Sequence, residues 1–112
     1  MNYKTIDIPI FPVILNVIIS DDWSEVPKNF NIKLEEEDLN HEGLVGEVEN
    51  SKNSYYVLLR SNTTLETIVH ESIHIATNIH KCCQIGLDWD NDEVLAYLTE
   101  WIFKEINNVT KL

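Results

Sequence analysis

Hydrophobic and polar residues alternate in two different ways along the chain, and the change falls near residue 60. Before that point, residues 13–19 are mostly aliphatic and β-branched, a composition typical of a strand that is covered on both faces. Residues 44–49 and 55–60 flank the polar segment 50–54, which is the pattern of a β-hairpin. The N-terminal half is therefore predicted to form a small sheet.

After residue 60 the hydrophobic period becomes 3.6 residues, as in an amphipathic helix. Thr63 and Glu66 have the Thr-x-x-Glu spacing of a capping box, which satisfies free amide groups at a helix start. A helix is predicted over residues 64–83, and Gly86 is available for a left-handed cap after its end. The core face of this helix is expected to contain the apolar residues that share one arc of the helical wheel: Leu65, Ile68, Ile75, Ala76, Ile79 and Cys83.

A second helix is predicted to begin near Asp90 or Asn91 and to end near Ile106. Its apolar stripe consists of Val94, Leu95, Leu98, Ile102 and Ile106. The order of strand, hairpin, helix and helix predicts an α+β fold, in which a small antiparallel or mixed sheet packs against the two helices. The length of 112 residues fits a single domain over residues 1–112.

Charge and cysteine content exclude several classes of protein. Eight Lys and Arg against 19 Asp and Glu give a formal net charge of −11, which argues against binding to nucleic acid or to an anionic membrane surface. Cys82 and Cys83 are adjacent and poorly placed for a disulfide, which favours a reducing, cytoplasmic location. The apolar run 8–19 is shorter than the roughly 20 residues of a membrane span, and its prolines disfavour a signal peptide.

The strongest chemical signal is the H-E-x-x-H pattern formed by His70-Glu71-Ser72-Ile73-His74, in the middle of the first predicted helix. Residues four apart project from adjacent turns, so two imidazoles can converge on one tetrahedral ion. His70 and His74 lie about 40° apart on the helical wheel and nearly opposite the apolar arc. They are therefore expected to face a cleft and to bind a metal ion, with Glu71 within reach of a water molecule beside it.

A catalytic zinc usually has three protein ligands and one open position, so a third ligand is needed. His80 has the metzincin spacing, but that motif places a glycine where this chain has Thr77, and a continuous helix would carry His80 about 9 Å along its axis from His74. His80 is expected at the edge of the core. Glu93, near the start of the second helix, is the better candidate, with a helix-capping role as its alternative. The lesser candidates are Asp88, Asp92 and Glu100.

The segments His70-Glu71-Ser72-Ile73-His74 and Asn91-Asp92-Glu93-Val94-Leu95-Ala96-Tyr97 together resemble the compact gluzincin-type metallopeptidases, which carry H-E-x-x-H and then E-x-x-A on the next helix. The chain is most similar to short phage and prophage proteins of SprT-like appearance, over roughly residues 55–103. This resemblance implies that His70, His74 and Glu93 are zinc ligands and that Glu71 is the general base. It also implies a twisted sheet packed on the active-site helix, with residues 55–60 as an edge strand beside the cleft.

These roles predict zinc-dependent hydrolysis of peptide or amide bonds in a peptide or protein substrate. Tyr97, one turn beyond Glu93, is a candidate to stabilise the developing oxyanion, and Tyr55, Tyr56 and His41 are further candidates. Two other functions stay open. The chain could be a zinc-stabilised protein-interaction module with weak catalysis, or an acidic decoy that occupies a DNA-binding protein.

Overall fold

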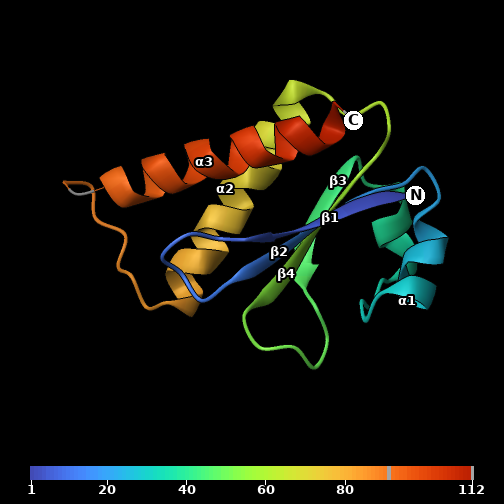
Figure 1. Cartoon of the computed structure of the whole chain (residues 1–112), viewed down its shortest axis with the longest axis horizontal. Helices are drawn as coiled ribbons and strands as arrows, with labels where there is room; N and C mark the ends of the chain where they lie inside the picture. The colour runs from blue at the N-terminus through green and yellow to red at the C-terminus, as the bar shows by residue number, and fades with distance from the viewer. Residues whose placement is uncertain (91, 112) are drawn as a thin grey trace.

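A four-stranded sheet forms the centre of the molecule, with the strand order β1-β2-β4-β3 (Figure 1). The computed structural model describes residues 1–90 and 92–111 of the chain. The strands are β1 (Asn2–Asp7), β2 (Ile14–Ile19), β3 (Gly43–Glu47) and β4 (Ser54–Leu59). The inner strands β2 and β4 are parallel, and each outer strand pairs antiparallel with its inner neighbour.

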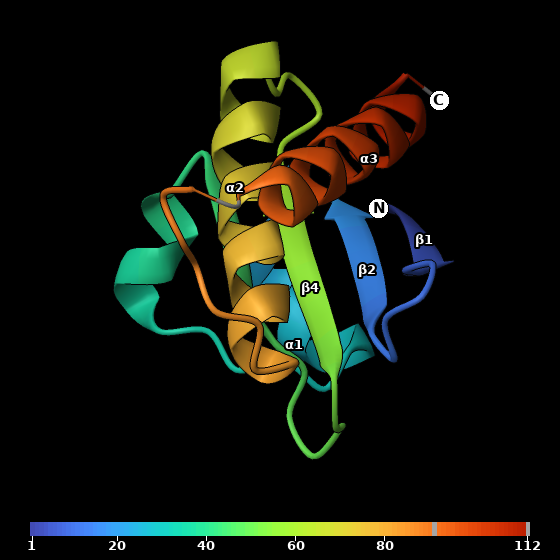
Figure 2. The ribbon, with the colours of Figure 1, turned by 90° about the vertical axis from the view of Figure 1, so that its left-hand side faces the viewer.

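Helices cover one face of the sheet, and a short helical segment covers the other (Figures 1 and 2). Because side chains alternate along a strand, successive residues of β4 enter two different cores. The larger core joins the sheet to α2 (Leu65–Cys82) and α3 (Glu93–Thr110). The smaller core joins it to η1 (Trp23–Glu25) and α1 (Val26–Asn29), through Trp23 and Val26. This arrangement confirms the predicted α+β fold.

Two of the strand predictions are confirmed and one is wrong. The strand predicted over 13–19 is β2, and the predicted hairpin is β3 and β4. However, β4 is not the edge strand expected beside the cleft, because it pairs with β2 on one side and with β3 on the other. Its residues 55–59 are all buried, as an inner strand requires. The strand beside α2 is the edge strand β3, and β1 was not predicted at all.

The helix α2 agrees with its predicted range to within one residue at each end. Its N-cap is Thr64 rather than Thr63, and the Thr64 hydroxyl accepts a hydrogen bond from the Thr67 N–H at 3.3 Å. Leu65, expected in the core, is 57% exposed. The left-handed residue after α2 is Gln84, with φ 57°, and not Gly86.

The helix α3 begins at Glu93 and ends at Thr110, four residues beyond the predicted end at Ile106. The predicted start falls partly on Asn91, which lies outside the described residues. Leu98, Ile102 and Ile106 are buried as expected, whereas Val94 is 44% exposed. Among the described helices, none is both long and apolar enough to cross a membrane.

Candidate metal centre

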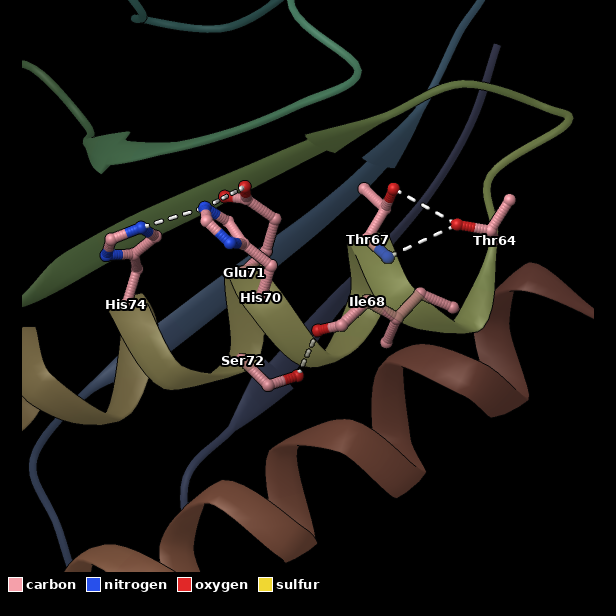
Figure 3. Close-up of polar contacts among 7 residues, drawn as sticks. All are labelled: Thr64, Thr67, Ile68, His70, Glu71, Ser72 and His74. Atoms are coloured by element: carbon pink, nitrogen blue, oxygen red, sulfur yellow. Dashed lines mark hydrogen bonds and ion pairs between the residues drawn. The ribbon is translucent and has the colours of Figure 1, made fainter.

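The two histidines of the H-E-x-x-H pattern lie side by side on adjacent turns of α2, on the flank that faces β3 (Figure 3). Their Nε2 atoms are 3.2 Å apart, and their rings stand edge to face at an interplanar angle of 76°. Two imidazole nitrogens bound at about 2.05 Å to one tetrahedral zinc would lie roughly 3.3 Å apart. His70 and His74 therefore have the spacing of two ligands that share one cation.

Glu71 lies beside this pair, with its Oε1 atom 3.8 Å from the Nε2 atom of His70. The side chain is largely buried, and burial raises the pKa of the carboxyl above its usual range. Positive charge on three nearby imidazoles lowers the pKa of Glu71 and so partly offsets this effect: His70, His74 and His41. Glu71 is therefore placed to exchange a proton with a molecule held next to the two imidazoles.

The close approach of β3 to α2 depends on a glycine. A Cβ atom added to Gly43 would lie 2.9 Å from the Cγ atom of Glu71 and 3.0 Å from the Cγ2 atom of Thr67. A side chain at position 43 would push the strand away from the helix or displace the Glu71 carboxylate. Gly43 thus lets the backbone of the edge strand form one wall of the site.

A hollow of about 340 Å³ separates β3 from the histidines of α2. Residues from the strand side and the helix side line it: His41, Gly43, Leu44, Val45, His70, Glu71, His74 and Asn78. His41 also lines a neighbouring hollow with Glu42 and Glu66, so this histidine stands at the rim of the site. His41 was one of the predicted candidates for the oxyanion donor, and the structure places it at the rim of this hollow.

The structure does not bring the predicted third ligand to the histidines. Glu93 is exposed at the start of α3, and Figure 3 shows α3 on the side of α2 opposite the two imidazoles. Within residues 1–90 and 92–111, no three His, Cys, Asp or Glu side chains are arranged to hold a metal ion. The lesser candidates Asp88, Asp92 and Glu100 therefore do not complete the set either. Ala96, the alanine of the E-x-x-A pattern, is exposed.

Among the other candidates, Tyr97 is exposed, whereas Tyr55, Tyr56 and His80 are buried. Tyr97 is 68% exposed on α3 and is not among the described residues that line the hollow, so its predicted role as oxyanion donor receives no structural support. Tyr55 and Tyr56 are buried on opposite faces of β4. His80 is buried, and its Nδ1 atom lies 3.0 Å from the carbonyl oxygen of Ala76, which confirms the core position expected for it.

Comparisons with protein-family models, with curated proteins and with solved structures found no match to this chain. The resemblance to gluzincin-type peptidases therefore rests on the residues of the two motifs. Taken by itself, the geometry offers two imidazoles, a neighbouring carboxylate and an open hollow beside a strand edge. The two imidazoles, His70 and His74, could supply two of the ligands of a transition metal such as zinc.

Proposed function

We propose that this chain is a zinc-dependent peptidase that hydrolyses peptide or amide bonds, acting in a cytoplasmic setting. One observation carries the proposal: the Nε2 atoms of His70 and His74 are 3.2 Å apart and face an open hollow, with the buried carboxylate of Glu71 beside them. A pair of histidines that served only to stabilise the fold would be expected inside the core, as His80 is.

Each residue of the site has a distinct role in this proposal. His70 and His74 would hold a zinc ion, which would supply a Lewis acid able to polarise a carbonyl group and to lower the pKa of water to about 7. Glu71 accepts a proton from the attacking water and returns it to the leaving amine. In the form of the proposal in which His41 is not a zinc ligand, it can donate a hydrogen bond from the rim to the developing charge on the substrate oxygen.

The edge strand provides a binding surface for an extended substrate. β3 pairs with β4 on one side only, and its residues 43–45 line the hollow beside the histidines. A peptide that pairs with the other side of β3 would pass directly over Glu71, and main-chain hydrogen bonds would hold it.

The proposal has two forms, which differ in the identity of the third zinc ligand. Glu93 stays the ligand predicted from the sequence, and it can bind only if the start of α3 moves relative to α2. His41 is a second candidate, because it lines the hollow together with His70 and His74. Within the described residues these three side chains are not arranged to hold one ion, so His41 would also have to move to bind it. Elemental analysis of protein purified without added metal, compared for wild type, His74→Ala, Glu93→Ala and His41→Ala, distinguishes these two forms.

Hydrolysis itself is tested with Glu71→Gln, which keeps the shape of the side chain and removes its basicity. We expect cleavage of a casein or peptide mixture, followed by mass spectrometry, to fall by about 10²–10⁴-fold while zinc content stays near stoichiometric. Wild-type protein that binds zinc and cleaves nothing would remove the peptidase proposal.

A zinc-stabilised interaction module is the second candidate, because the described residues bring together two histidine ligands and no third. In that case Glu71→Gln would leave partner binding unchanged, and zinc would raise the stability of the protein without any cleavage.

A further inference from the structure

A second hollow of about 450 Å³ adjoins the histidine site at the far end of α2. The two hollows share Asn78, which lies one helical turn beyond His74. Polar side chains dominate the lining of the second one: Glu47, Ser51, Lys52, Asn53, Ser54, Tyr55, Asn78, Lys81 and Cys82. We call it the lysine hollow. Because Asn78 lines both, the two hollows lie next to each other along α2, and we refer to them together as the groove.

The charges of the lysine hollow are unusual for this chain. The whole sequence has eight Lys and Arg against 19 Asp and Glu, yet Lys52 and Lys81 both line this hollow and only one carboxylate, Glu47, does so. Across the described residues, no lysine or arginine lies within 4.0 Å of a carboxylate. Both ammonium groups are thus available to a ligand, and their combined charge exceeds that of Glu47.

The neutral groups of the hollow present hydrogen-bond donors. The Cys82 thiol lies 3.0 Å from Asn53 Oδ1 and donates to it, which leaves the amide hydrogens of Asn53 for a ligand. Ser54 Oγ accepts a hydrogen bond from Asn16 at 3.3 Å, which leaves the Ser54 hydroxyl hydrogen as a donor. Two cations surrounded by such donors match the chemistry of a carboxylate, which in its ionised form only accepts hydrogen bonds.

The distance between His74 and Lys81 along α2 determines how far from the scissile bond this carboxylate would lie in a peptide substrate. Lys81 follows His74 by seven residues, which corresponds to about 10 Å along a helix axis. An extended peptide covers that length in about three residues. A peptide held with its scissile bond at the histidines therefore reaches the lysine hollow about three residues away.

We propose that the lysine hollow binds a carboxylate of the peptide substrate and so selects acidic segments or chain ends. This inference rests on the proposed peptidase function for the position of the scissile bond. The carboxylate has two possible sources, an acidic side chain or the C-terminus of the peptide, and both present the same chemistry to Lys52 and Lys81.

The test uses binding rather than cleavage, with the full chain carrying Glu71→Gln. The probes are four ten-residue peptides of one uncharged, N-acetylated sequence, with glutamate or glutamine at an internal position and a carboxylate or an amide at the C-terminus. Isothermal titration at low salt measures each Kd. We expect one kind of carboxylate to strengthen binding by about tenfold over its neutral counterpart, and the peptide concerned identifies the source.

Matched variants locate the effect. Lys52→Gln combined with Lys81→Gln should remove the preference, whereas Lys4→Gln combined with Lys104→Gln changes the net charge equally and should keep it. Lys4 and Lys104 are both exposed and lie outside the lysine hollow. Glu47→Gln should tighten binding of the preferred peptide by about threefold, because it removes the one opposing charge. Circular dichroism checks that every variant is folded.

Equal affinity for all four peptides, the absence of any binding, or an equal loss in both lysine pairs would overturn the lysine hollow as a carboxylate site. These binding results are independent of cleavage and zinc content in the wild type. Failure of the peptidase proposal is therefore detected by those two measurements and not by this test. A charge preference in a protein that cleaves nothing would support the hollow as a peptide-binding site alone.

Discussion

The two flanks of α2 differ in burial, in chemistry and in what lies against them. One flank, the core flank, packs on the sheet and α3, and its residues are at most 2% exposed: Ile68, Ser72, Ile75, Ala76 and Ile79. The other, the groove flank, faces β3 and is partly or fully exposed: Thr67, His70, His74 and Asn78. Ser72 is the polar residue of the core flank, and its hydroxyl group has a hydrogen-bond partner: it donates to the Ile68 carbonyl oxygen at 2.7 Å.

This difference shows how a single helix can separate stability from chemistry. Burial of apolar surface on the core flank holds α2 in place, so residues on the groove flank are not needed for packing. Glu71 stands between the flanks and is the exception, since its carboxylate is buried. Substitutions on the core flank should therefore lower the free energy of unfolding, whereas substitutions on the groove flank should change metal or peptide binding with little effect on stability.

The largest effect on stability is expected from Ile75→Ala on the core flank. Ile75 is fully buried, and removing its side chain would leave a cavity that costs about 3 kcal/mol of unfolding free energy. Urea denaturation measures this loss. Ile73→Ala is the matched control, because Ile73 is 47% exposed on the same helix and should cost less than about 1 kcal/mol. Similar losses in the two variants would contradict the division into flanks.

Gly43→Ala tests the wall of the groove and should have an intermediate effect. The new Cβ would meet Glu71 and Thr67, so we expect a loss of about 1–2 kcal/mol and a shift of the Glu71 carboxylate. Gly46→Ala on the same strand is the control, because its Cβ would instead meet the Tyr56 ring in the smaller core. Both variants should be destabilised, but only Gly43→Ala should weaken zinc or peptide binding at the site. Equal binding defects would argue that β3 acts only through stability.

His74→Ala should leave the metal-free protein almost unchanged in stability, within about 0.5 kcal/mol, because alanine is a better helix former at an exposed position. Added zinc should raise the melting temperature of the wild type and not that of the variant, since a ligand that binds the native state stabilises it. Differential scanning fluorimetry with and without a chelator measures both. A loss above about 2 kcal/mol without metal would mean that this flank is structural.

Asp21 lies on neither flank of α2, and Asp21→Asn should give the smallest change in stability. The Ser61 hydroxyl and N–H donate to the Asp21 carboxylate at 2.7 and 3.0 Å and lower its pKa below the usual value. Because the pKa is lower in the folded state, the stabilisation is present above the unfolded value of about 3.9 and is lost as the pH falls through the folded pKa. Thermal unfolding should show a difference from wild type at pH 7 that shrinks at pH 3; a difference that grew at pH 3 would reverse this assignment.

The sequence predicted α2 and its histidines well because their signals are local. A capping threonine and a 3.6-residue period lie within the helix itself, and the relation between positions 70 and 74 follows from helix geometry alone. β1 was missed because it is an edge strand in which only Ile6 is buried, so it has no hydrophobic face to detect.

The position of Glu93 could not be predicted in the same way. It depends on the direction that the chain takes after α2, which no local pattern specifies. The prediction placed a left-handed turn at Gly86, whereas the turn falls at Gln84, a residue type that seldom adopts positive φ. The flank of α2 on which α3 packs is therefore a tertiary property that the spacing between His74 and Glu93 does not reveal.

The parallel pairing of β2 with β4 has a consequence for how the chain folds. In this pair Ile14 lies opposite Ser54, forty positions away in the sequence, whereas α2 and α3 meet after a short connection. High contact order slows folding, so we expect closure of the central strand pair to limit the rate. Stopped-flow refolding tests this: Val17→Ala in β2 should slow folding, and Ile106→Ala in α3 should mainly speed unfolding. The opposite pattern would place the helical pair in the folding nucleus.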